Sequence, residues 1–140
     1  MILTAREFLE QYGEAERQVR RLKNEYEKEL QLIDSLGSGG DGTPRGSAIS
    51  RTTENKALRL AAALDEWERA KENALEVRQQ VFRVVHKVPG VAGDVLYKRY
   101  IELMQWEDVA DAVGYSPSRV YDLHREGLRI VNSVVNRSQE

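Results

Sequence analysis

The chain has 140 residues, of which 31% are charged and 41% are apolar; its formal net charge is −2, and it has no cysteine. This balance is typical of a soluble, helix-rich protein, and the lack of cysteine excludes a disulfide framework and a thiol nucleophile. No apolar run approaches the roughly 18 residues of a membrane-spanning helix, and Arg6, Glu7 and Glu10 argue against a secretory signal. We therefore expect a cytoplasmic protein with no membrane partner.

The first predicted element is a long helix over residues 4–36. Thr4 and Glu7 have the T-x-x-E spacing of a capping box, and Leu3 and Phe8 take the positions of a hydrophobic staple. Apolar residues then recur at spacings of three and four, at Phe8, Tyr12, Ala15, Val19, Leu22, Tyr26, Ile33 and Leu36. Such a narrow stripe on a charged helix is suited to packing against one partner helix.

Residues 37–50, GSGGDGTPRGSAIS, are predicted to be a flexible linker, because five glycines and a proline oppose regular structure.

A second long helix is expected over residues 53–88, capped by Thr52 or Thr53. Its apolar stripe contains Leu60, Leu64, Trp67, Ala74, Val81, Val84 and Val88. The two helices predict an antiparallel hairpin over residues 1–88, which could also act as a coiled-coil arm and pair two chains into a homodimer.

A second domain is predicted over residues 89–140, because Pro89 and Gly90 form a helix stop signal. Three short helices follow, over residues 92–103, 106–113 and 116–135. Within the last two, Ala110 is small enough for a close crossing, and Gly114 lies where a left-handed backbone is common. Ser116 can cap the next helix, with Pro117 at its first position. This spacing is typical of a helix-turn-helix, with an inward face of Val120, Leu123, Leu128 and Val131.

The run LYKRYIELMQWEDVADAVGYSPSRVYDLHREGLRIV resembles region 4 of bacterial sigma factors. The shared features are an L-x-x-R-Y helix, a W-E-x-(V/I)-A helix, G-Y-S, and a last helix ending V-Y-x-L-H-x-x-(A/G)-L. The run looks closest to the small phage and prophage proteins of Gram-positive bacteria that have such a helix-turn-helix and are usually described as transcriptional regulators. The motif covers about a quarter of the chain, residues 95–131. The resemblance implies a protein that binds double-stranded DNA with its last helix in the major groove.

Five side chains of that helix point away from its apolar face: Ser118, Arg119, Tyr121, Asp122 and Arg125. Either arginine could donate two hydrogen bonds to a guanine, and Ser118 or Tyr121 could reach phosphates or base edges. Asp122 could accept from a cytosine amino group, or could repel phosphate. The alternative is that all five are ordinary solvent-exposed residues.

Three further residues are candidate contacts to the DNA backbone. Ser116 and the N–H groups at its helix start could hold a phosphate, and Lys98 and Arg99 lie on the supporting helix. The sequence also departs from the family at several positions. Pro117 removes a potential reading side chain, Gln105 replaces the usual Ser or Thr cap, and Gly127 replaces the usual Ala. Asp122 and Glu126 lower the positive charge of the last helix.

Charge limits the affinity expected of this domain, because residues from 90 onward include six basic and eight acidic residues. Dimerisation, or docking on RNA polymerase, could supply the missing binding energy. Two other functions remain open. One is a phage DNA-packaging subunit, because small terminase subunits also join a helix-turn-helix to oligomerisation helices. The other is a protein-interaction module that binds polymerase.

Enzymatic activity is not expected, because the sequence has no Ser/His/Asp set, no phosphate-binding glycine loop and no paired acidic motif with metal spacing. No cofactor is predicted either. His86 and His124 are too isolated for a metal site and are interpreted as surface or helix-packing residues. Trp67 and Trp106 occupy stripe positions and are interpreted as core residues.

Overall fold

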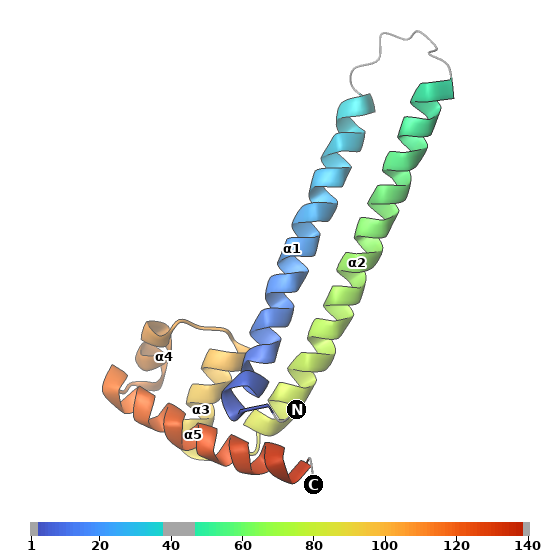
Figure 1. Ribbon diagram of the computed structural model, residues 1–140. Coiled ribbons are helices and arrows are strands. Elements are labelled where there is room, and N and C mark those ends of the chain that lie inside the picture. The colour runs from blue at the N-terminus through green and yellow to red at the C-terminus, as the bar shows by residue number, and fades with distance from the viewer. Residues whose placement is uncertain (1–2, 38–46, 139–140) are drawn as a thin grey trace. The chain divides into compact units, whose positions relative to one another are not determined.

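A computed structural model of the protein describes residues 3–37 and 47–138, which form helices and turns and contain no strand (Figure 1). The expected all-α fold is confirmed. Two long helices, α1 (Ala5–Gly37) and α2 (Ser47–Val85), form an antiparallel hairpin. The central part of the predicted linker, residues 38–46, lies outside the described residues.

The predicted bounds of the second long helix are wrong at both ends. Residues 47–50 were expected to belong to the linker, but they are helical, so that Thr52 and Thr53 lie inside α2 rather than at its cap. The tolerance of Ala48 and Ile49 for a helix explains this extension, because Gly46 is the last strong breaker before them. The helix ends at Val85 instead of Val88.

The chain divides into two compact units whose boundary crosses the long helices. We call residues 1–15 and 74–140 the base, and residues 16–73 the arm. The boundary expected between residues 88 and 89 lies inside the base. The N-terminal end of α1 and the C-terminal end of α2 share a core with the short helices.

The arm consists of the distal parts of α1 and α2. The rings of Tyr26 and Trp67 stack across the hairpin with centroids 5.4 Å apart, and the Lys71 ammonium lies 4.1 Å from the centroid of the Trp67 ring. Within residues 16–34 and 51–73, Ala70 is the only buried apolar side chain. The apolar stripes are only half-buried there, because each helix has a single neighbour within its unit.

The base adds four elements to the ends of the long helices: α3 (Gly90–Leu96), a π-helical turn η1 (Tyr97–Ile101), α4 (Trp106–Val113) and α5 (Pro117–Ser138). Its core receives at least one fully buried side chain from α1, α2, α3, α4 and α5. These residues are Leu9, Val81, Val95, Leu96, Val109, Val120 and Val131.

The start of α1 has the predicted cap. The Glu7 backbone N–H donates to Thr4 Oγ1 over 3.1 Å, and the Thr4 hydroxyl donates to the Glu7 carboxylate over 3.0 Å. In the usual capping box the glutamate carboxylate accepts from the backbone N–H of the cap residue. Here the Glu7 carboxylate accepts from the Thr4 hydroxyl instead. These contacts fix the entry of α1 into the base.

The helix predicted over residues 92–103 differs from the observed one. The observed helix begins at Gly90 and widens after Leu96 into a π turn, in which the Glu102 N–H donates to the Tyr97 carbonyl over 3.0 Å. It ends at Ile101, and two residues later Leu103 has a φ of 58°, in the left-handed region that a non-glycine residue adopts only at an energetic cost. The π turn ends the helix without a glycine.

Candidate nucleic-acid interface

The connection between α4 and α5 has the predicted helix-turn-helix geometry. Gly114 has a φ of 75°, and its N–H donates to the Ala110 carbonyl over 3.0 Å, which ends α4. Ser116 Oγ then accepts the Arg119 N–H over 3.3 Å, and Pro117 is the first residue of α5. The helix start at Gln105 has no side-chain cap, as its residue type predicted.

The inward face of α5 anchors the helix against α3 and α4. Val120 and Leu123 are buried, and Leu128 packs partly buried against the same core. Gly127 lies against Leu96, because a Cβ built at this glycine would come within 2.9 Å of a Leu96 methyl carbon. The departure from the usual Ala therefore has a structural reason, since Gly127 permits close packing of α5 on α3.

A buried aromatic and histidine cluster supports the middle of α5. The Tyr100 hydroxyl and His124 Nε2 lie 2.7 Å apart in a hydrogen bond. Trp106 packs edge-on against the His124 ring, with centroids 4.7 Å apart. The Trp106 ring also packs against Tyr121, with centroids 5.3 Å apart. Of the two interpretations of His124 from sequence, helix packing is the one observed. These contacts hold the middle of α5 against η1 and the start of α4.

Tyr100 and His124 are neutral near neutral pH. Burial, followed by the positive charges of Arg6 and Arg99, lowers the pKa of the His124 imidazole from 6.5 to about 4. Burial also raises the pKa of the Tyr100 phenol. The hydrogen bond between them therefore joins two uncharged groups, which suits a partly desolvated position.

The outward face of α5 presents the residues predicted to read DNA. Ser118, Arg119, Tyr121, Asp122 and Arg125 are all exposed. A shallow surface recess brings three of them together with two further charged residues, and it is lined by Arg119, Asp122, Arg125, Glu126 and Arg129. The Arg125 guanidinium donates to the Asp122 carboxylate, so that these two side chains form one unit on the surface.

The two predicted backbone contacts on the supporting segment have partners within the base. The Arg99 guanidinium donates to the Met104 carbonyl over 2.9 Å and lies 4.7 Å from the centroid of the Trp106 ring. Lys98 pairs with Glu102 at 3.8 Å. Arg99 thus holds the loop between η1 and α4, a role that the sequence analysis did not predict.

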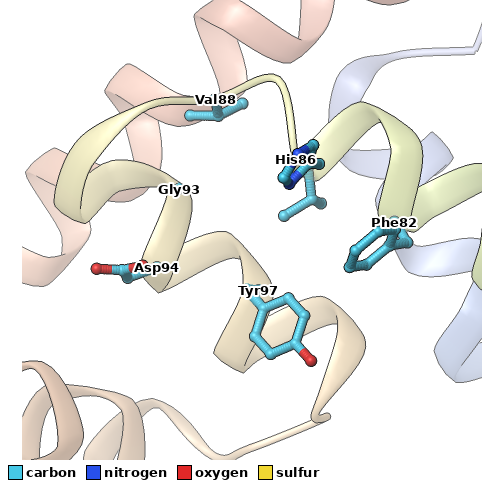
Figure 2. Close-up of a pocket in the computed structure, with 7 residues that line it drawn as sticks. Phe82, His86, Val88, Gly93, Asp94 and Tyr97 are labelled. Carbon is cyan, nitrogen blue, oxygen red and sulfur yellow. The ribbon is translucent and has the colours of Figure 1, made fainter.

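A separate pocket of about 350 Å³ lies where the end of α2 meets α3 and η1 (Figure 2). Phe82 stacks on His86 and meets Tyr97 edge-on, with centroids 5.7 and 6.3 Å apart. Asp94 is the one acidic residue of its lining. Gly93 has a structural reason here, because a Cβ at this position would clash with the Val88 carbonyl oxygen.

Within the part of the chain that the structure describes, no three His, Cys, Asp or Glu side chains are grouped to hold a metal ion. Over the same residues, no helix has both the length and the apolar character needed to cross a membrane.

No model of a known protein family matches the sequence, and neither a curated protein nor a solved structure matches it.

Proposed function

We propose that the protein is a sequence-specific binder of double-stranded DNA that regulates transcription, with α5 as the helix that enters the major groove. The observation that supports this most directly is the outward strip of α5, where Arg119, Arg125 and Asp122 lie exposed on a helix with a buried opposite face. Arginine and aspartate are residue types that recognise guanine and cytosine edges. The resemblance to sigma region 4 favours phage or prophage genes as targets.

The Asp122–Arg125 ion pair gives the reading surface a defined donor and acceptor arrangement. A guanine would compete with Asp122 for the Arg125 guanidinium, whereas a neighbouring cytosine could donate to the carboxylate and leave the pair intact. Tyr121 is 48% exposed, and Trp106 supports its ring, so its hydroxyl is suited to a phosphate. Ser116 and the α5 N-terminus supply further backbone contacts.

The arm supports a second part of the proposal, a homodimer paired through the long helices. Its apolar stripes are half-buried, and Leu58 is 69% exposed. A second arm would cover this surface, and two copies of α5 would then contact two half-sites. Docking on RNA polymerase is the other route by which a domain of mixed charge could gain affinity.

The experiment is selection of bound fragments from genomic DNA at low salt, followed by comparison of binding by variants. Arg119→Ala with Arg125→Ala should lose the enrichment, since each bidentate arginine contributes about 1–3 kcal/mol of discrimination. Arg83→Ala with Lys87→Ala is the matched control, because it removes the same charge from exposed sites at the end of α2 and in the turn after it. If wild type enriches no fragment over random competitor, a protein-interaction role replaces the proposal.

The molar mass in solution separates the regulatory role from packaging. A monomer or dimer agrees with a regulator, whereas a closed ring of about eight or more chains favours a DNA-packaging subunit. Light scattering coupled to size exclusion measures this directly. Leu58→Lys should shift a dimer towards the monomer, because it places a charge within the exposed apolar surface of the arm.

A further inference from the structure

The C-terminal half of α5 has a different charge character from the half predicted to read bases. Between residues 117 and 126, Arg119 and Arg125 are balanced by Asp122 and Glu126. From Gly127 to Ser138 there is no acidic residue, and Arg129 and Arg137 are the charged residues. The net positive charge of α5 therefore lies beyond the residues predicted from the sequence.

The exposed residues of this second half continue the strip formed by the first half. They are Arg129, Asn132, Ser133, Asn136 and Arg137. A first group of exposed residues, Ser118, Asp122 and Arg125, lies on one side of the helix. With about 3.6 residues per turn, Arg129, Asn132 and Asn136 lie on the same side, within about 90° around the helix axis. Any surface that meets the first half therefore lies on the same side of α5 as the second half.

The length of the strip exceeds what a single groove can hold. From Ser118 to Arg137 the helix rises about 29 Å, at 1.5 Å per residue. The major groove is about 12 Å wide. A helix that places its first turns in the groove and crosses it at an angle therefore brings its far end to the sugar-phosphate backbone at the groove edge, as the C-terminal end of a homeodomain reading helix does.

The buried face of the same half holds it in place. Val131 and Val135 are buried in the core of the base, with Ile130 packed against them. Two hydrogen bonds brace the exposed polar face: Ser133 Oγ donates to the Arg129 carbonyl, and Asn136 Nδ2 donates to Asn132 Oδ1. Arginine, asparagine and serine are among the side chains that most often contact phosphate oxygens.

We propose that Arg129, Asn132, Ser133, Asn136 and Arg137 form a second DNA contact that binds the sugar-phosphate backbone beyond the groove read by the first half of α5. This inference rests on the proposed DNA-binding function. The contact is independent of sequence and supplies affinity that the balanced charges of the reading half do not. A purely structural alternative is that both arginines stabilise the C-terminal end of the helix dipole.

The test measures the salt dependence of binding with the full chain and a selected genomic fragment, using fluorescence anisotropy. Arg129→Gln with Arg137→Gln should lower the slope of log K against log salt by about 1.8, at about 0.9 per phosphate. Between 50 and 200 mM salt this makes the loss of affinity about 12-fold smaller than for wild type. The variant should keep the wild-type order of preference among fragments.

A second variant tests the same strip without changing side-chain size. Asn132→Asp with Asn136→Asp adds two negative charges and should weaken binding about tenfold at low salt. Arg83→Gln with Lys87→Gln, the charge-matched control on exposed sites at the end of α2 and in the turn after it, should leave the slope unchanged.

The outcomes separate the two proposals. If wild type selects a fragment but both strip variants keep its slope and affinity, the second contact is overturned while the reading helix stands. A lower melting temperature with an unchanged slope points to the helix-dipole role and overturns it as well. If wild type selects no fragment, the proposed function itself fails.

Discussion

The base and the arm are built from the same two long helices, with apolar residues at the same spacing, yet they bury these residues to different extents. Leu9 and Val81 in the base are 0% exposed, whereas Ala70 is the one buried apolar side chain within residues 16–34 and 51–73 of the arm. In the base the short helices give each long helix several neighbours. A stripe alone is therefore insufficient for a core, because burial requires surrounding elements on more than one side.

This difference between the base and the arm bears on the proposed function. The base holds α5 through buried packing and the Tyr100–His124 hydrogen bond, so its exposed face is presented in one orientation. The proposed reading of DNA needs such rigid support, since contacts displaced by about 1 Å lose much of their effect. The arm has half-buried stripes instead, and its surface is suited to a further helical partner.

The largest expected effect comes from truncating one leucine in each unit. Leu96→Ala in the base should lower the free energy of unfolding by about 3–4 kcal/mol, because Leu96 is fully buried and its removal leaves a cavity. Leu64→Ala in the arm should cost about 1 kcal/mol, because the side chain is only half-buried. Urea denaturation monitored by circular dichroism measures both.

An equal cost for the two variants would contradict the comparison. It would mean that the arm stripe is covered by more than its own hairpin. Repeating the Leu64→Ala measurement over a range of protein concentrations then identifies the cause, because a dimer interface makes the cost concentration-dependent.

The second effect is a pH dependence located in the base. The pKa of His124 is about 4 in the folded protein and near 6.5 when unfolded, so the native state binds fewer protons between these values. Stability from this group is fully present above about pH 6.5 and is lost as the pH falls towards 4. From about pH 7 to about pH 5 the loss should be about 2 kcal/mol.

Unfolding at the two pH values, compared between wild type and variants, checks this sign. His124→Gln should be less stable than wild type at pH 7 and should lose most of the difference between the two pH values. His86→Gln is the matched control, because His86 is exposed, and it should retain that difference. The account of the buried cluster is wrong if His124→Gln keeps the full dependence as well.

The smallest effect concerns the one described non-glycine residue with positive φ, Leu103. Leu103→Gly should be more stable than Leu103→Ala by about 0.5–1 kcal/mol, since glycine adopts the left-handed conformation without the cost that a Cβ incurs. Both variants lose the same leucine side chain, which is 39% exposed, so the comparison isolates the backbone effect. Thermal unfolding measures the difference, and at Leu75, in the helical part of α2, the glycine variant should instead be less stable than the alanine variant.

Local sequence signals determined much of the fold. The all-α class, the cap at Thr4, the hairpin and the turn at Gly114 and Ser116 were predicted correctly, because each depends on residues close together in the chain. The outward positions of Ser118, Arg119, Tyr121, Asp122 and Arg125 also followed from helical periodicity. Their contacts with DNA stay a prediction.

Only the tertiary structure decided how distant residues meet. The extent of the base, the π turn before Leu103 and the use of Arg99 to hold a loop depend on packing between α1, α2 and the short helices. The choice between a surface and a packing role for His124 required Tyr100 to be placed beside it. Periodicity identifies the face a helix buries, whereas the neighbours on that face are determined by the packing of the whole unit.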